Sequence, residues 1–344
     1  MADTLKKKQY ARPPKTVLEH ILDHEIEITG TLLSGVFVAY LVGLPWAEKC
    51  LFLSYRLGPN AYTKGYNDIY FIAFWVVAFT FLRAAIMNYV YHPLARLVGV
   101  EASKRQRLAE QGFAFTYCTI FWTWGMYIMY NSPYWFNTSY YWIDYPHIFL
   151  STNVKSYYLM QTAFWFQQVY TIHAEKRRKD HVAMVSHHFI TITLLVSSYC
   201  SNFTRIGNAV LCCTDLADIL LSLAKCLKYL NFPTLCDIAF ASFALAWPIT
   251  RHIFFSIIIW ATITEPHKYL DMLWEPEKGK YFTPFTQSLY IILFVLLNLI
   301  MVYWFTMIVK VVVKVIRGDN AEDTRSDSED DEEPQAPNGK MKHQ

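Results

Sequence analysis

The sequence predicts an all-α integral membrane protein with about eight spans. Of its 344 residues, 54% are hydrophobic and 17% are aromatic, and its mean hydropathy is +0.17. Soluble domains rarely combine such values. The apolar residues also gather in runs of about 20, the length that an α-helix needs to cross a bilayer. Eight such runs follow one another, at residues 31–53, 68–90, 113–130, 156–173, 183–200, 206–224, 236–263 and 285–312.

Two of these runs are irregular. The first is interrupted by Pro45, and proline cannot continue a helix. The fourth contains Gln161, Gln167 and Gln168, whose amides need hydrogen-bonding partners away from water. We therefore expect the fourth run to pack among other helices rather than to face lipid.

Basic residues orient the chain, because the short cytosolic connections of membrane proteins are rich in lysine and arginine. Here they gather before the first run, in residues 91–112 and 174–182, and after the sixth and eighth runs. The alternate connections contain fewer. This pattern predicts that both termini are cytosolic. The glycosylation sequon at Asn137 would then lie on the far side, where a glycan could be attached.

The two ends of the chain differ in charge. Residues 319–333 hold nine acids and one arginine, so the net charge of +3 combines a basic body with an acidic tail. We expect the tail to be disordered, with Ser326 and Ser328 as phosphorylation sites. The ending Lys340-Met-Lys342 is similar to retrieval signals of the endoplasmic reticulum. The predicted parts are a basic cytosolic segment (1–30), N-terminal spans (31–100), the main membrane domain (101–315) and the tail (316–344).

Two neighbouring apolar runs each contain a pair of ionisable residues, and such residues are costly inside a membrane and usually functional. His187 and His188 lie near the start of the fifth run, and Asp215 and Asp218 lie in the sixth. A short connection joins the two runs, so their helices should be antiparallel neighbours. The imidazoles and carboxylates are then expected at a similar depth, in a site that opens toward the cytosol.

Helical spacing extends this group. Thr191 lies four residues after His187 and shares its face, whereas His188 is aligned with His181. Ser222 continues the stripe of the two aspartates. A carboxylate can fix the tautomer of an imidazole and stabilise its cation, which makes the other ring nitrogen a base or a nucleophile. The alternative is a hydrogen-bonded pair that only joins two spans.

A metal site is a further alternative, since histidine boxes bind di-iron in membrane hydroxylases and desaturases. Those proteins usually carry several boxes. This chain has only the spacing His181-x5-His187-His188, with His173 upstream. Its seven cysteines show no metal-binding spacing. The sequence therefore predicts no metal site.

Further cations lie near the histidines and aspartates. Arg251, inside the seventh run, is expected either to pair with an aspartate or to meet a substrate phosphate or hydroxyl. Lys176, Arg177 and Arg178 immediately precede the histidine helix. They are either ordinary cytosolic flanking charges or an attraction for a phosphorylated soluble co-substrate.

The stretch HHFITITLLVSSYCSNFTRIGNAVLCCTDLADILLSLAK, residues 187–225, resembles the Lag motif of the ceramide synthases. The preceding EKRRKDH also matches, and similarity to the TLC domain of that family extends over about residues 100–315. The connection SYCSNFTRIGN and the acidic tail are like those of fungal members. The features that carry the resemblance are the paired histidines, Asn202-x-Thr204-Arg205-x-Gly207-Asn208 and Asp215-x-x-Asp218.

The resemblance implies a TLC core of six to seven helices and N-acylation of a sphingoid base by a fatty acyl-CoA in the endoplasmic reticulum. It implies that His187, His188, Asp215 and Asp218 are essential, with acyl-CoA as co-substrate and no further cofactor. A small single-span accessory subunit and a homo- or hetero-oligomer are implied as partners, and nucleic acid is not. The segment 264–284 would influence acyl-chain length.

Two catalytic routes fit these residues. In the first, a histidine deprotonates the amine, which attacks the bound acyl-CoA directly. In the second, a histidine attacks the thioester and holds the acyl group as an acyl-imidazole until the amine displaces it. We favour the second route, because two imidazoles allow the nucleophile and the base to be separate residues. A non-catalytic TLC-type membrane protein is the remaining alternative.

Overall fold

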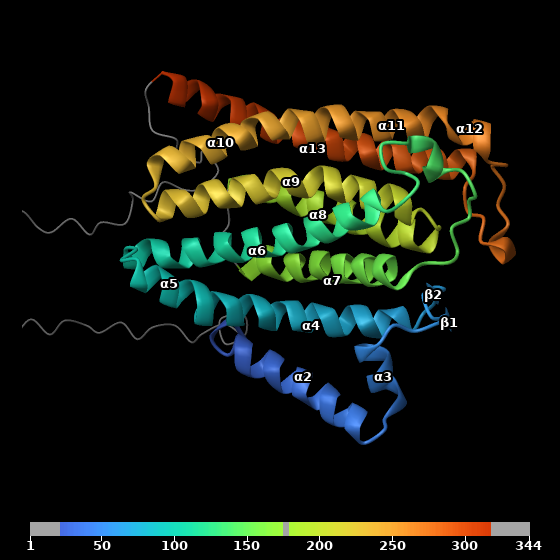
Figure 1. Ribbon diagram of the computed structural model, residues 1–344, viewed down its shortest axis with the longest axis horizontal. Helices are drawn as coiled ribbons and strands as arrows, with labels where there is room; N and C mark the ends of the chain where they lie inside the picture. The colour runs from blue at the N-terminus through green and yellow to red at the C-terminus, as the bar shows by residue number, and fades with distance from the viewer. Residues whose placement is uncertain (1–20, 175–178, 318–344) are drawn as a thin grey trace, which may run out of the picture.

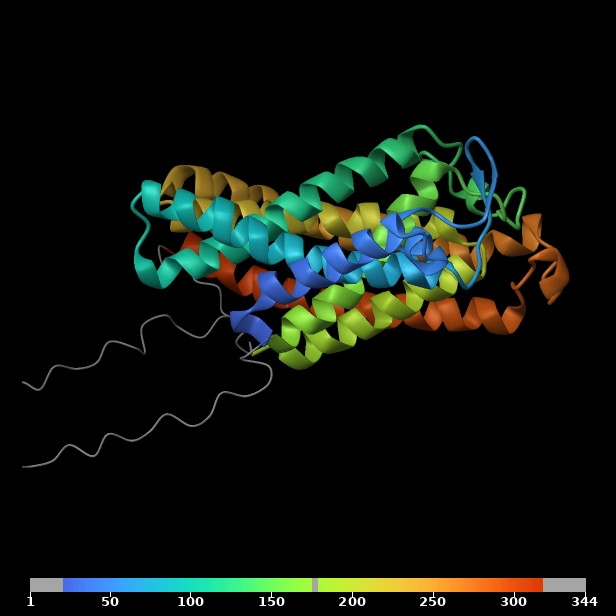
Figure 2. The same cartoon turned by 90° about the horizontal axis from the view of Figure 1, so that it is seen from below.

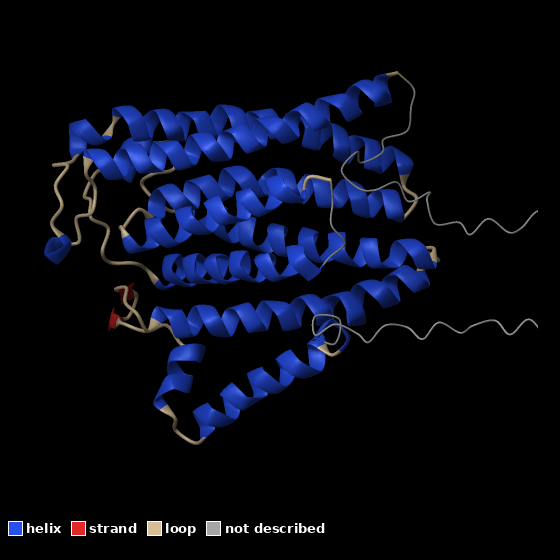
Figure 3. Ribbon diagram, turned by 180° about the vertical axis from the view of Figure 1, so that it is seen from behind, coloured by secondary structure: helices blue, strands red, loops and turns tan. Residues whose placement is uncertain are grey.

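The computed structural model describes residues 21–174 and 179–317, and in this part of the chain nearly all regular structure is helical (Figure 1). The long helices run roughly along one axis and form a single bundle (Figures 1 and 2). Two short strands, β1 (Arg56–Gly58) and β2 (Ala61–Tyr62), pair as a hairpin at one end of it (Figure 3). The predicted helical class is confirmed.

Seven long helical segments build the bundle within the described residues. Two of them contain a π-helical turn, at η1 (Met87–Tyr91) and η3 (Pro248–Phe254). Short elements η2 (Thr138–Tyr141), α12 (Pro266–Tyr269) and η4 (Pro276–Lys278) lie in the connections. The segments are α4 (Asp68–Ile86) with η1 and α5 (His92–Leu97), α6 (Ala102–Tyr130), α7 (Thr152–Ala174), α8 (His181–Cys200), α9 (Thr204–Tyr229), α10 (Pro233–Trp247) with η3 and α11 (Phe255–Thr264), and α13 (Pro284–Ile316). Each of the last seven predicted runs falls within one segment.

The first predicted run, 31–53, is interrupted at Pro45 as expected, and it does not form one continuous helix. Its residues are divided between α2 (Glu25–Leu41) and α3 (Pro45–Leu51), which lie at one edge of the bundle beside α4 (Figures 1 and 2). Between them Gly43 has a φ of +80°, a left-handed conformation that commonly follows a helix end. Pro45 then starts α3, because its fixed φ suits the first helical turn.

Four helical segments of the described chain are long and apolar enough to cross a membrane, Asp68–Leu97, His181–Cys200, Pro233–Thr264 and Pro284–Ile316. The helices α6, α7 and α9 have the length but are more polar, and they contribute polar residues to an interior cavity. Such residues are tolerated at membrane depth where they face protein or a water-filled space. The chain thus has the character of a membrane protein, and the count of eight spans stays a prediction.

The two described ends of the chain lie toward the same end of the bundle. The beginning of α2 and the end of α13 lie toward the end of the bundle that also holds α5, whereas β1, β2 and α12 lie at the opposite end (Figure 1). Asn137 is exposed in the connection between α6 and α7. The predicted acidic tail with Ser326 and Ser328 and the Lys340-Met-Lys342 ending lie outside the described residues. Which end of the bundle faces the cytosol stays a prediction.

A buried ionic network fastens the bundle near β1 and β2. Lys155, at the start of α7, forms a 2.8 Å ion pair with Asp68 at the start of α4. The Lys155 Nζ also donates to the carbonyl oxygens of Ser54 and Thr63, and the hydroxyl of Tyr199 donates to Asp68 at 2.8 Å. Buried charges are stable only when they are paired and hydrogen-bonded. The network therefore holds the ends of α4, α7 and α8 in one arrangement.

Candidate active site

Two cavities meet inside the bundle. The first is lined almost entirely by apolar surface, mainly from α8, α9 and α13, and contains about 740 Å³ of space not filled by protein atoms. The second is larger, about 1540 Å³, and has a more polar lining from α6, α7, α8 and α9. The residues that line both cavities are Trp165, His187, Asp218 and Arg251. We call this place the junction.

The apolar cavity follows α8 away from the junction. Its lining on this helix runs from His187 to Ser198, a length of about 16 Å at the rise of an α-helix. At its far end, Trp142, Phe203 and Phe282 line it and contact one another, with ring centroids 5.0 to 6.0 Å apart. The cavity therefore has the shape and surface to hold a hydrocarbon chain whose polar end is at the junction.

His187 stands at the junction between two indole rings. The ring centroids of Trp165 and Trp304 are each 5.3 Å from its own, at interplanar angles of 69° and 75°. Its Nδ1 atom is buried and has no hydrogen-bond partner among the described residues. Aromatic contacts rather than hydrogen bonds thus orient this imidazole, and its nitrogen lone pair is not engaged by a donor.

His188 differs from its neighbour in its hydrogen bonding. Its Nδ1 lies 2.7 Å from the carbonyl oxygen of Met184. Because a carbonyl oxygen only accepts, Nδ1 must carry the proton, and in the neutral ring Nε2 is then the basic nitrogen. The ring lines only the polar cavity. Its centroid is 5.7 Å from that of His187, at an interplanar angle of 86°, so the two rings are edge-to-face neighbours.

Trp304 is itself held by a buried carboxylate. Its Nε1–H donates to Asp180 Oδ2 at 3.0 Å, although 124 residues separate the two in the sequence. Asp180 is the residue directly before α8, so this bond connects the start of the histidine helix to α13. It fixes the indole that packs against His187.

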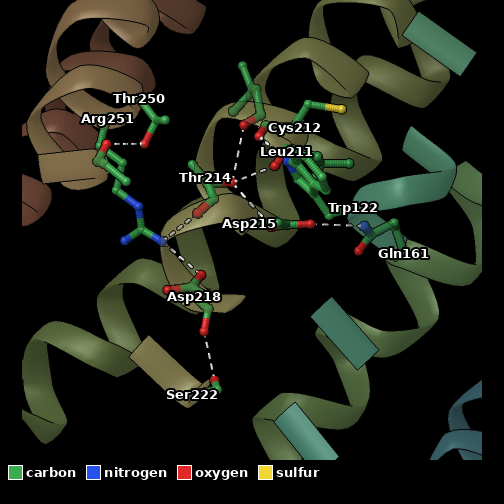
Figure 4. Close-up of polar contacts among 12 residues, drawn as sticks. Trp122, Gln161, Leu211, Cys212, Thr214, Asp215, Asp218, Ser222, Thr250 and Arg251 are labelled. Carbon is green, nitrogen blue, oxygen red and sulfur yellow. Dashed lines mark hydrogen bonds and ion pairs between the residues drawn. The ribbon is translucent and has the colours of Figure 1, made fainter. Parts of the chain in front are cut away.

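Asp215 lies on α9 among polar groups of α7 (Figure 4). Its carboxylate is buried and accepts from Gln161 Nε2 and from Thr214 Oγ1, each at 3.4 Å. Gln161 in turn accepts from the Tyr117 hydroxyl at 3.0 Å. Its Nε2 also donates to the Tyr157 hydroxyl at 3.3 Å, so this glutamine, expected to need partners inside the bundle, has three. Asp215 lines only the polar cavity.

Asp218 and Arg251 form the charged wall of the junction. The Arg251 Nη2 atom contacts Asp218 Oδ2 at 2.7 Å and donates to the Thr214 carbonyl oxygen at 2.7 Å (Figure 4). The guanidinium also lies over the Trp247 ring, 4.0 Å from its centroid, a favourable cation–π geometry. Arg251 reaches this place from η3, a π-helical turn that begins at Pro248. The predicted pairing with an aspartate is confirmed for Asp218.

The expected pairing of histidine with carboxylate is absent from the described structure. All four residues, His187, His188, Asp215 and Asp218, line the polar cavity, but neither histidine is hydrogen-bonded to an aspartate. The carboxylates have other donors instead, the amide of Gln161 and the guanidinium of Arg251. The structure therefore brings the four together around one space without joining them into pairs.

Of the remaining predicted site residues, the structure describes two, and both line the polar cavity. His181 and Ser222 line the polar cavity, and the Ser222 hydroxyl donates to the Asp218 carbonyl oxygen at 2.7 Å. Lys176, Arg177 and Arg178 lie outside the described residues. Among the described residues, no group of three or more histidine, cysteine, aspartate or glutamate side chains could hold a metal ion.

Several residues of the junction were not found from the sequence. Trp165, Trp304 and Asp180 orient His187 or its neighbours, yet tryptophan in an apolar run looks like any other core residue. Asp180 belongs to the EKRRKDH stretch that matches the family, and this membership is the signal that the sequence offers for it. The packing of α7 and of α13 against α8 brings the three residues together.

Comparison with known proteins identifies the family. The model of the TLC domain matches residues 107–310. The chain is 41% identical over 295 residues to sphingosine N-acyltransferase lag1 of Schizosaccharomyces pombe, and the match covers 84% of this chain and 75% of that protein. It is 35% identical over 285 residues to ceramide synthase LAG1 of Saccharomyces cerevisiae, covering 81% and 69%. The chain belongs to the TLC-domain ceramide synthase family.

Membership in the ceramide synthase family makes this protein an acyltransferase and confirms the resemblance found in the Lag motif. The two alternatives, a di-iron hydroxylase and a non-catalytic TLC-type protein, do not match the names of these relatives. The region matched by the TLC model extends from α6 into α13 and contains all four residues of the junction. The helices α2 and α3 precede it.

Proposed function

We propose that this ceramide synthase family member transfers a fatty acyl group from acyl-CoA to the amine of dihydrosphingosine or phytosphingosine through an acyl-imidazole on His187. The observation that carries the proposal is the position of His187 at the junction of an apolar and a polar cavity. A thioester whose chain fills one cavity and whose CoA part occupies the other has its carbonyl beside this imidazole.

The apolar cavity supports a long acyl chain as the donated group. Its lining is almost entirely apolar and extends along α8 from His187 to Ser198, about 16 Å at the rise of an α-helix. Each buried methylene contributes about 0.8 kcal/mol, so the cavity favours long chains over short ones.

His187 is suited to be the nucleophile because its ring is not engaged by hydrogen bonds. An unprotonated ring nitrogen attacks the thioester carbonyl carbon, a C–N bond forms and the C–S bond breaks. The proton on the other ring nitrogen of His187 passes to the CoA thiolate as it leaves, so the acyl-imidazole is neutral. The acyl group remains on the imidazole. Trp165 and Trp304, which pack on either side of this ring, limit the access of water to the intermediate.

His188 is suited to be the general base. Its Nδ1–H is committed to Met184, so Nε2 can accept a proton from the ammonium of the sphingoid base. The freed amine attacks the acyl carbon, and its second proton passes to the ring nitrogen of His187 as the bond to His187 breaks and the amide forms. His188 then releases the first proton to water in the polar cavity. Both histidines line the polar cavity and their rings are neighbours, so an amine bound in this cavity is expected to reach both.

The other polar residues support binding in this proposal. Asp218 holds Arg251, and Asp215 supplies negative charge near the two imidazoles. His181 and Ser222, which line the polar cavity, belong to the side that receives CoA. Lys176, Arg177 and Arg178 come shortly before α8 in the sequence, and their charges are proposed to attract the CoA phosphates.

The test is product analysis with purified protein, one sphingoid base and a series of acyl-CoA lengths. We expect N-acylated base and one equivalent of CoA, with turnover rising toward long chains. With acyl-CoA alone, mass spectrometry of the digested protein should find an acyl adduct on the peptide that contains His187. Absence of amide with every chain length contradicts the function, whereas amide without any adduct, and CoA release only in the presence of both substrates, contradicts the covalent route alone.

Asp180 is expected to act through Trp304. Replacing it with leucine removes the acceptor of the indole N–H, and we expect acylation of His187 to slow roughly tenfold, because small displacements of a reacting group are costly. Asp180→Asn keeps an acceptor and should stay within a few-fold of the wild type. In a Trp304→Phe background the leucine change should have no further effect. An additive loss in that double variant would mean that Asp180 acts by another route.

The cellular setting is part of the proposal. We place the protein in the endoplasmic reticulum membrane as a multi-pass enzyme, with both termini cytosolic and no cofactor beyond acyl-CoA. A small single-span accessory subunit and a homo- or hetero-oligomer are proposed as partners. Asn137 is the proposed glycosylation site, and Ser326 and Ser328 are proposed phosphorylation sites that tune activity or trafficking without changing the chemistry.

A further inference from the structure

The hydroxyl of Thr191 is buried in the wall of the apolar cavity without a partner. The residue is 8% exposed, it lines that cavity, and its Oγ1 atom has no hydrogen bond within the described residues. An unpaired polar group in an apolar wall is unfavourable unless something that binds there satisfies it. Thr191 therefore points to a ligand oxygen or nitrogen at this position of the cavity.

Its neighbours on α8 show that the unpaired state is specific to this position. The hydroxyls of Thr193, Ser197 and Ser198 donate to backbone carbonyl oxygens three or four residues earlier, as serine and threonine commonly do in helices. The same kind of acceptor, the carbonyl oxygen of His187, precedes Thr191 by four residues. Thr191 does not use it, so its hydroxyl is available to the cavity.

A second donor at the junction is also unpaired. Arg251 is 4% exposed, and its Nε atom has no partner among the described residues, whereas Nη2 is held by Asp218 and by the Thr214 carbonyl oxygen. These contacts fix the guanidinium plane. Arg251 and Thr191 both line the apolar cavity at His187, and an arginine N–H can only donate.

The two donors flank the carbonyl that the reaction would change. Thr191 lies one helical turn from His187 on the same face, with Cβ atoms about 5–6 Å apart. Arg251 approaches from η3 on the other side of the junction. An acyl carbonyl bonded to the His187 ring would lie between them. Two fixed donors at a developing negative charge are what acyl transfer requires.

We propose that the Thr191 hydroxyl and the Arg251 Nε–H form the oxyanion-binding site of this enzyme, an inference that rests on the proposed function. When His187 attacks the thioester, the carbonyl π electrons move to oxygen, and these two groups hydrogen-bond to it. The electrons return as the C–S bond breaks. The same oxygen becomes negative again when the amine attacks, and it collapses as the bond to His187 breaks. One site thus serves both halves of the reaction.

The hydroxyl groups of the sphingoid base are another chemistry that Thr191 could meet. The choice of substrate distinguishes an oxyanion donor from a donor that binds a hydroxyl of the sphingoid base. An oxyanion donor affects every acyl transfer to a similar degree, including formation of the acyl-enzyme before any base is present. A donor that reads a hydroxyl affects only bases that carry it, because a site built to bond a hydroxyl discriminates strongly against an analogue without one.

The experiment compares Thr191→Val with Thr191→Ser in the purified full-length chain. Valine has the shape of threonine without the hydroxyl, and we expect kcat to fall about 10²–10³-fold with dihydrosphingosine and with 1-deoxydihydrosphingosine alike, with little change in KM. Acylation by acyl-CoA alone should slow in parallel. Serine keeps the hydroxyl and should stay within a few-fold of the wild type. Thr193→Val, at a partly exposed position of α8 that lines neither cavity, is the matched control and should not change turnover.

Binding of an S-alkyl-CoA thioether, which has no carbonyl oxygen, separates catalysis from cavity shape. The wild type and Thr191→Val should bind it equally, whereas weaker binding by the variant would assign Thr191 a packing role. Wild-type turnover in Thr191→Val, or a loss confined to hydroxylated bases, would overturn the oxyanion assignment. Failure of the wild type to form any amide would instead overturn the proposed function.

Discussion

Replacing His187 with alanine is expected to abolish ceramide formation, with a loss of at least about 10³-fold, because the nucleophile of the covalent route is removed. The adduct formed with acyl-CoA alone should disappear as well. His187→Ala should still fold, since its Nδ1 has no hydrogen bond to lose within the described residues. The measurements are the rate of amide formation and the mass of the histidine peptide after exposure to acyl-CoA.

His188→Ala is the matched variant, and it separates the two roles. We expect the acyl adduct to form and to persist, while transfer to the amine slows about 10²–10⁴-fold, the usual contribution of a general base. Raising the pH should partly restore transfer, because more of the amine is then deprotonated in solution. If His188→Ala loses the adduct and His187→Ala retains it, the assignment of nucleophile and base must be exchanged.

The helices were predictable from the sequence because their apolar runs are long. Seven of the eight runs coincide with continuous helical segments, and even the polar fourth run is helical as α7. The first run is divided at Pro45, as its sequence indicated, but composition alone did not reveal the direction of the second helix. Gly43 and Pro45 together turn the chain into a second helix, although the apolar character continues across them. Local backbone chemistry, rather than hydrophobicity, decides that segment.

The site was predictable in its residues but not in its pairings. Ionisable groups in apolar runs indicated His187, His188, Asp215 and Asp218, and all four line one cavity. Which partner each group has depends on side chains from distant segments. Arg251 pairs with Asp218 because a π-helical turn brings the arginine to α9. No spacing in the sequence indicates that turn.

The junction itself could not have been predicted. It exists because α8 has an apolar cavity on one side of His187 and a polar cavity on the other. A single helix face read from the sequence contains the histidine and the apolar residues that follow it, but the empty space is a property of how α7, α9 and α13 pack around α8. The orphaned Thr191 hydroxyl becomes informative only once that space is known.

Breaking the pair of Asp218 and Arg251 is expected to reduce both stability and activity. Asp218→Ala leaves a buried arginine without its counter-ion, and removing one partner of a buried pair costs about 3–5 kcal/mol. The cost here should be smaller, because the Asp218 side chain is 44% exposed, while that of Arg251 is 5% exposed. Activity should fall about 10²-fold, because the guanidinium loses one of the contacts that orient it. Asp218→Asn keeps an acceptor for Nη2 and should lie between the alanine variant and the wild type.

The double variant Asp218→Ala with Arg251→Met distinguishes the two effects. Removing both charges leaves no uncompensated cation, so thermal unfolding of the purified protein should return toward the wild-type temperature. Activity should not return, because the proposed oxyanion donor is gone. A double variant as unstable as Asp218→Ala would mean that the ion pair does not account for the loss of stability. Recovered turnover would show that Arg251 takes no part in the reaction and acts only as a structural counter-ion to Asp218.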